Sequence, residues 1–153
     1  MTPRFVADIL RSTWLWHFSR VLITFMYWYA AIGFIIHFHS AEADITLTGL
    51  RPRWLIAGLT IAVELIGSGL IILDRAVWFG AGMLGVFTLL TIPLDHAFWN
   101  MTGLAAVQAR LESEEHLTVV GGLIVVSILS FLRKEQGQPH RLASLSPSRP
   151  EFP

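Results

Sequence analysis

The sequence contains no cysteine and few charged residues, and both shortages limit what the protein can be. With Cys 0, the chain can form neither disulfides nor thiolate metal sites, and it cannot carry out dithiol exchange. Charged residues make up 14% of the chain, against roughly 25% in ordinary soluble domains. The 11 basic and 11 acidic residues cancel, so the chain lacks the basic surplus that nucleic-acid binding requires. We expect no nucleic-acid partner.

Hydrophobic residues are abundant instead. They make up 54% of the chain, and the mean hydropathy is +0.59. A helix needs about 20 apolar residues to cross the hydrocarbon core of a bilayer. Four stretches approach that length, at residues 21–38, 54–73, 77–94 and 117–132. The sequence therefore predicts an all-α protein, an antiparallel bundle of four transmembrane helices whose membrane domain covers residues 21–132.

The positions of lysine and arginine around these spans predict the orientation. Basic residues are enriched in the cytoplasmic segments of membrane proteins. One side of the predicted bundle carries Arg4, Arg11, Arg20, Arg75, Arg133, Lys134, Arg141 and Arg149. The other side carries Arg51, Arg53 and Arg110. We expect a multi-pass protein of a bacterial inner (plasma) membrane with both termini in the cytoplasm.

The segments outside the spans have their own patterns. Residues 1–20 are expected to form a cytoplasmic or interfacial segment. Apolar residues at roughly helical spacing in Ala97–Leu111 predict a short interfacial helix between the third and fourth spans. Residues 133–153 are polar and rich in proline and serine, which predicts a flexible cytoplasmic tail.

Glu64 lies near the middle of the second span, where an ionised carboxylate costs at least a few kcal/mol on insertion scales. It should therefore face the bundle interior, where the neutral acid could donate a hydrogen bond, for example to Tyr29, Thr88, Thr91 or a backbone carbonyl. One interpretation is a structural polar clamp. The other is a site that binds a polar ligand or relays a proton.

Histidines and carboxylates gather at the predicted outer ends of three spans. Imidazole and carboxylate suit zinc, copper or iron, and helical bundles build metal sites from several helices. No two of these histidines have i, i+4 spacing on one helix, so interfacial polarity is the favoured explanation and a metal site is the alternative. The candidate metal ligands are His37, His39, Asp95, His96, Glu115 and His116.

Several short motifs, taken together, resemble the DoxX/DoxD family of small four-span membrane proteins. The matching residues are Arg20 at the start of the first span, 62–67 (Ala-Val-Glu-Leu-Ile-Gly) with Gly69, 96–99 (His-Ala-Phe-Trp) and 116–123. The resemblance covers about residues 15 to 132. It implies the four-helix fold and an association with membrane redox or stress-response assemblies.

Two functional hypotheses follow, and whether the chain is an enzyme stays open between them, with a role that is not catalytic on its own favoured. In the first, it is an accessory or structural subunit of a larger membrane complex or self-associates, contacting partners through Phe98, Trp99 and Leu104. In the second, it handles a metal, haem or quinone through the histidines and Glu64, with Tyr29, Arg20 and Trp99 as further ligand or polar-network candidates. Arg20 could also reach the headgroups and pair with anionic lipid. A minimal transporter using Glu64 ranks last.

Overall fold

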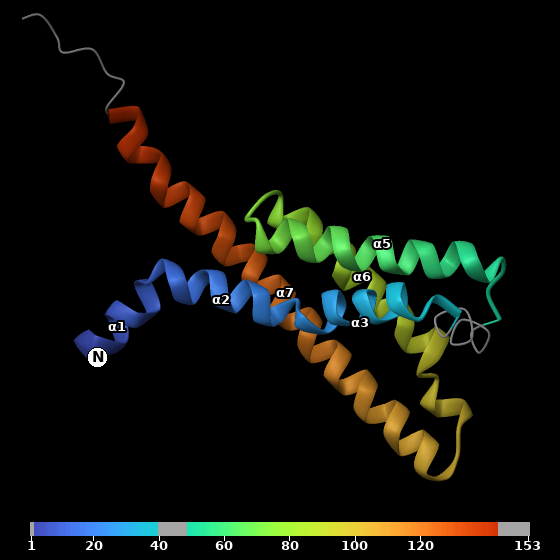
Figure 1. The fold of residues 1–153 in the computed structure, drawn as a ribbon. Coiled ribbons are helices and arrows are strands. Elements are labelled where there is room, and N and C mark those ends of the chain that lie inside the picture. The colour runs from blue at the N-terminus through green and yellow to red at the C-terminus, as the bar shows by residue number, and fades with distance from the viewer. Residues whose placement is uncertain (1, 40–48, 144–153) are drawn as a thin grey trace, which may run out of the picture.

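The computed structural model describes residues 2–39 and 49–143, and this part of the chain is all-α (Figure 1). A short helix α1 and two consecutive helices α2 and α3 precede the longer helices α5 and α6. A 3₁₀ turn η1 then leads into the longest helix, α7. The bounds are α1 Arg4–Arg11, α2 Thr13–Ile23, α3 Phe25–Ile36, α5 Arg53–Ile72, α6 Val77–Asp95, η1 Phe98–Asn100 and α7 Gly103–Ala143.

Three of these helices are long and apolar enough to cross a membrane: α5, α6 and α7. The bent pair of α2 and α3 makes a fourth crossing if the two together form one span. The second and third predicted spans, 54–73 and 77–94, agree with α5 and α6 to within a residue, and 117–132 lies inside α7. Membrane-helix character is thus confirmed, with three or four crossings.

The first predicted span differs from the structure. Instead of one helix over residues 21–38, helix begins at Thr13 and is broken at Thr24, where α2 and α3 meet at 51°. The Thr24 hydroxyl donates to the backbone oxygens of Arg20, at 2.8 Å, and Val21, at 3.2 Å. Hydroxyl groups bonded back to the preceding turn tend to bend helices, which accounts for the break in an otherwise apolar run.

Helices α5 and α6 form a tight antiparallel hairpin. Their turn places Asp74 and Ala76 in the left-handed region, with φ of 57° and 47°. The helices touch at glycines: a Cβ added to Gly80 would lie 2.8 Å from the backbone oxygen of Gly67. Such close approach of backbones holds membrane helices together where lipid provides no hydrophobic drive.

Helix α7 extends well beyond its predicted span. At 41 residues it is about 60 Å long, and it runs diagonally across the other helices (Figure 1). The interfacial helix expected over Ala97–Leu111 is not a separate element, because the chain from Gly103 onward already belongs to α7. Nothing after Gly103 breaks the helix, which continues past Arg133 to Ala143. The rest of the expected tail, residues 144–153, lies outside the described residues.

The helices pack in a chain of neighbours rather than as a closed bundle. Helix α3 packs on α5, α5 on α6, and α6 on α7, while α2 reaches both α5 and α7. Among these described helices, α3 makes no close backbone contact with α6 or α7. The buried core joins the helices through Tyr27, Ile71, Val77, Ala81, Leu84, Leu123 and Val126. Because the bend at Thr24 directs α3 away from α7, a space remains between α3 and α6.

Candidate functional site

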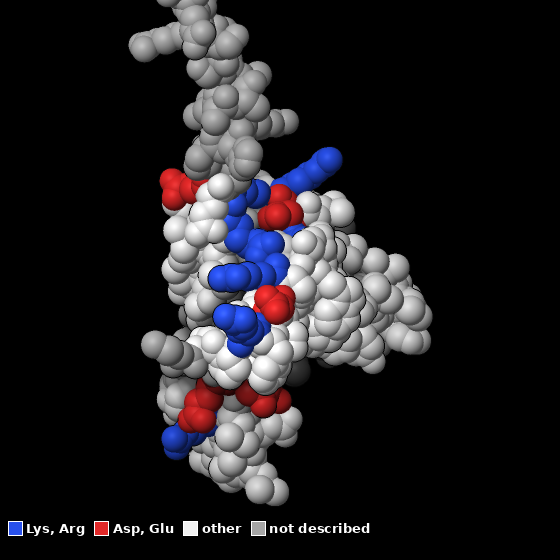
Figure 2. All heavy atoms as spheres, turned by 90° about the vertical axis from the view of Figure 1, so that its left-hand side faces the viewer, with Lys and Arg blue, Asp and Glu red and all other residues white. Residues whose placement is uncertain are grey.

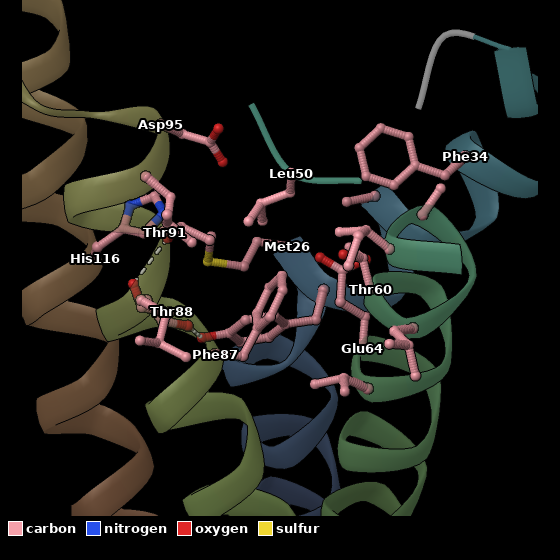
Figure 3. A pocket seen from close by; sticks show the side chains of 18 of the residues that line it. Met26, Phe34, Leu50, Thr60, Glu64, Phe87, Thr88, Thr91, Asp95 and His116 are labelled. Atoms are coloured by element: carbon pink, nitrogen blue, oxygen red, sulfur yellow. Dashed lines mark hydrogen bonds between the residues drawn. The ribbon is translucent and has the colours of Figure 1, made fainter. Parts of the chain in front are cut away.

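A cavity of about 420 Å³ occupies the space between α3, α5 and α6. Figure 3 shows its walls: Thr60 and Glu64 project from α5, Thr88 and Thr91 from α6, and Met26 lies between them. Most other lining side chains are apolar, including Phe34 and Phe87. The cavity runs from residues Asp95, His96 and His116 at one end of the helices to Glu64 halfway along α5. This is a mainly apolar pocket with few polar groups, as expected of a small-molecule site.

Glu64 is the only acidic side chain inside this pocket away from its end, and it is 5% exposed. Its Oε2 atom has no hydrogen-bond partner among the described residues. A carboxylate held there without a cation would be costly, so the neutral acid is the favoured form. The expectation that Glu64 faces the interior is confirmed, and its acid group is available to a ligand.

Tyr27 closes the bottom of the pocket by bridging α3 to α6. Its hydroxyl lies 2.5 Å from Oγ1 of Thr88, which itself donates to the backbone oxygen of Leu84 at 2.8 Å. Since the single hydroxyl proton of Thr88 goes to Leu84, Tyr27 must be the donor to Thr88. The hydroxyl of Thr91 is likewise a donor, to the backbone oxygen of Thr88 at 2.8 Å. The oxygens of Tyr27 and Thr91 therefore retain lone pairs that can accept a hydrogen bond.

His96, directly after α6, and His116, on α7, meet at the mouth of the pocket. The rings of His96 and His116 pack edge to face with centroids 4.9 Å apart. His96 Nδ1 lies 3.0 Å from Oε2 of Glu112, and His116 Nδ1 lies 2.6 Å from the backbone oxygen of Glu112. Two of the predicted outer histidines are thus brought together, and both contact Glu112, a residue of α7 that was not among the predicted ligands: His96 contacts its carboxylate and His116 its backbone oxygen.

The remaining candidates for metal binding do not join this pair in a ligand set. His37 and His39 lie exposed at the end of α3, Glu115 is exposed on α7, and Asp95 lines the pocket mouth. Within residues 2–39 and 49–143, no group of three or more histidine, aspartate or glutamate side chains is arranged to hold a metal ion. The described residues therefore give no support to a metal centre at this end.

Other candidates lie away from the pocket. Tyr29 is 65% exposed, whereas Tyr27, two residues earlier, is 2% exposed and faces the cavity. Trp99 and Leu104 are exposed near the turn between α6 and α7, and Phe98 is half-buried against Trp99. Tyr29 therefore does not line the pocket with Glu64, whereas Tyr27 does, with its hydroxyl bonded to Thr88.

Arg20 lies near the other end of the helices and is fully buried. Its Nη1 donates to the backbone oxygen of Ile71 at 3.1 Å and lies 3.4 Å from Oδ1 of Asp74. Asp74 also accepts from Oγ of Ser130 at 2.9 Å. Arg20 therefore ties α2 to the α5–α6 turn, and it does not extend freely to the headgroups as one sequence interpretation suggested.

The comparison with known families agrees with this architecture. The DoxX family model matches residues 15–97. The chain belongs to the DoxX family. No curated protein and no solved structure matches the chain. The DoxX match runs from α2 to the end of α6 and so includes Arg20, Glu64 and most of the pocket. It ends before α7, so the sequence resemblance noted at 116–123 lies outside it.

The sequence of this DoxX chain contains a signal that could have identified Tyr27 as a buried residue. Arg20, Thr24, Tyr27 and Ala31 follow one another at i, i+4, i+7 and i+11, and all four are buried. That spacing marks one face of a helix. A polar set on one face of an apolar span would have favoured Tyr27 over Tyr29. Asp74 gave no such signal, because in sequence it is simply a residue of a short turn.

Proposed function

We propose that this chain binds the polar head of a small, membrane-dissolved molecule of the quinone class in the cavity between α3, α5 and α6. The observation that supports the proposal is the buried, unpartnered Oε2 of Glu64 inside an apolar pocket. A buried polar atom without a partner costs about 1–3 kcal/mol. A ligand carbonyl that accepts the proton of Glu64 would recover that cost.

The polar groups of the pocket suit a ring that carries carbonyl or hydroxyl groups. Neutral Glu64 can donate to a quinone oxygen, while the oxygens of Tyr27 and Thr91 can accept from a quinol hydroxyl. Phe34 and Phe87 provide apolar surface for a flat ring. The cavity of about 420 Å³ falls in the usual range for small-molecule sites, roughly 300–1,000 Å³. The redox association implied by the family resemblance is consistent with such a ligand.

The test is a binding titration of the purified chain in mild detergent with a short-chain benzoquinone, followed by tryptophan fluorescence. The wild-type chain should bind saturably with one site. Glu64→Leu replaces the acid with an apolar side chain of similar size and removes the donor. It should weaken binding about tenfold or more, the usual cost of losing a hydrogen bond to a buried polar group.

Ser68→Ala is the matched control, because Ser68 is buried on the same face of α5, one turn from Glu64, and does not line the cavity. Its affinity should equal that of the wild type. If the response is linear and does not saturate, and an alkane of equal length reproduces it, the quinone partitions into the detergent. That result would reject the site. Equal binding by Glu64→Leu would reject the role of the carboxyl group.

A second proposed role is that of an accessory subunit, supported by the exposed residues between α6 and α7. Leu104 is 88% exposed and Trp99 lies close by in the chain, also exposed. Native electrophoresis of mild detergent extracts should show the wild-type chain in a larger assembly. Replacing Leu104 and Trp99 with glutamine should release the chain from that assembly. Trp78→Gln is the control, because Trp78 is also an exposed tryptophan but lies at the far end of α6. Migration of the wild type as a free monomer would reject this role.

The proposed location is a bacterial inner membrane, with both termini in the cytoplasm. Its support is the grouping of charges along the helices. Arg20, Arg75 and Lys134 lie around the α5–α6 turn, whereas Arg53 and Arg110 lie toward the other ends of their helices. An excess of basic residues on one side favours that side as cytoplasmic.

A further inference from the structure

Positive charge accumulates around the indole ring of Trp16, at the end of the helices opposite the mouth of the cavity. The guanidinium carbons of Arg20 and Arg133 lie 5.2 Å and 5.0 Å from the centre of that ring. Lys134 follows Arg133 on α7 and places Nζ 3.6 Å from Oδ1 of Asp74. Figure 2 shows lysine and arginine side chains running as a stripe across this side of the molecule, with few acidic groups between them.

The carboxylate of Asp74 is shared among too many donors to balance this charge. It lies within ion-pair distance of both Arg20 and Lys134 and also accepts from Ser130. Arg133 has no carboxylate within ion-pair distance in the described ranges, and its recorded contact is the face of Trp16. Arg20 and Lys134 therefore share one carboxylate and Arg133 has none in the described part of the chain, so positive charge is in surplus at the exposed side chains of Arg133 and Lys134.

His17 adds a neutral donor beside these cations. Its Nδ1 lies 2.6 Å from Nη2 of Arg20. Arginine can only donate, so Nδ1 accepts and the ring proton resides on Nε2. His17 is exposed, which leaves that N–H available. Arg133, Lys134 and His17 together provide several donors and a net positive charge, the chemistry that binds a phosphate group.

We propose that this cluster, defined as His17, Arg133 and Lys134 around Trp16 and Arg20, binds the phosphate of an anionic phospholipid. The source is a lipid rather than free phosphate because apolar side chains continue from the cluster along both helices. Phe18 on α2 and Phe131 and Leu132 on α7 are exposed and can contact acyl chains. Each basic residue near an anionic surface contributes on the order of 1 kcal/mol.

The experiment measures lipid binding to the full chain in neutral detergent by native mass spectrometry. Phosphatidylglycerol is titrated against phosphatidylcholine, which has the same phosphate but no net charge. The wild-type chain should retain one phosphatidylglycerol at concentrations where phosphatidylcholine is lost. Arg133→Gln with Lys134→Gln should weaken phosphatidylglycerol binding about tenfold or more, and leave phosphatidylcholine binding unchanged.

Both substituted side chains are exposed, so the double variant should keep its fold, and an unchanged melting temperature verifies this. Arg110→Gln is the matched control, because Arg110 is exposed on the same helix but near its other end, paired with Glu114 at 2.9 Å. Equal retention of the two lipids, or unchanged phosphatidylglycerol binding in the double variant, would overturn the proposal. Displacement of the lipid by millimolar inorganic phosphate would also overturn it, by assigning the site to a free anion.

Discussion

At the scale of residues, the chain depends on a few buried polar groups on the inner faces of its helices. Arg20, Thr24 and Tyr27 are buried along α2 and α3, and Glu64 and Ser68 along α5. Hydrogen-bond partners are present for Nη1 of Arg20 and for the hydroxyls of Thr24 and Tyr27. Among the described residues, three buried atoms have none: Nε of Arg20, Oε2 of Glu64 and Oγ of Ser68. In a bilayer each unpaired group is costly. The hydrogen-bonded groups therefore stabilise the fold, and of the three unpaired atoms only that of Glu64 belongs to a residue that lines the cavity.

Tyr27 and Tyr29 provide a direct comparison of a bridging and a lipid-facing hydroxyl. Tyr27→Phe removes the hydrogen bond between α3 and α6 and leaves the oxygen of Thr88 without its donor. We expect unfolding free energy to fall by about 1 kcal/mol, measured by thermal or denaturant unfolding in detergent. Tyr29→Phe should have no effect, because its ring is exposed. Equal effects of the two substitutions would contradict the assigned bridge.

At the scale of elements, bends and close contacts decide how the helices are arranged. The sequence pattern located α5 and α6 accurately, because their apolar runs end in a short polar turn. It did not locate the break at Thr24, since a threonine in an apolar run can equally well remain inside a straight helix. The break is decided by the hydrogen bonds of its hydroxyl to Arg20 and Val21. It displaces α3 and so opens the pocket.

Gly80 is expected to be the glycine most sensitive to substitution in the hairpin of α5 and α6. A Cβ there would meet the backbone oxygen of Gly67 at 2.8 Å and Cβ of Leu70 at 3.0 Å. Neither atom can move without shifting α5, so Gly80→Ala should destabilise the chain by roughly 1–3 kcal/mol.

Gly82→Ala, two residues along the same helix, is the control. A Cβ at Gly82 has nothing within 4 Å, so the exchange should be neutral or stabilise by up to about 1 kcal/mol through helix propensity. Unfolding in detergent measures both variants. A loss of stability at Gly82 equal to that at Gly80 would show that the glycines act through backbone flexibility rather than helix contact.

At the scale of the whole molecule, the two ends of the helices differ in chemistry. One end gathers Arg20, Arg133 and Lys134 around Asp74, and the other carries His96, Glu112 and His116 around the mouth of the pocket. The ligand pocket and the proposed lipid site therefore belong to opposite ends.

The absence of cysteine allows this topology to be tested with single introduced thiols. Arg75→Cys and Arg133→Cys should react with a membrane-impermeant maleimide from the same side of sealed vesicles, and Arg110→Cys from the opposite side. With four crossings, a thiol at Arg11→Cys should label together with Arg75→Cys. Labelling of Arg11→Cys on the side of Arg110→Cys would mean that α2 and α3 form a re-entrant segment.

The sequence by itself determined the membrane character, the helical class, two of the helices almost to the residue, and the inward direction of Glu64. It could do so because the hydrophobic length of a span and the cost of a buried charge are local properties of the chain. The pocket, the choice of Tyr27 over Tyr29, the pairing of His96 with Glu112 and the role of Asp74 were decided only by tertiary structure. The pocket and the choice of Tyr27 depend on how far the bend at Thr24 separates α3 from α6. The pairing of His96 with Glu112 and the contacts of Asp74 depend on which turn of α7 lies beside each end of α6. Such distances between segments remote in sequence leave no periodic pattern in a single chain.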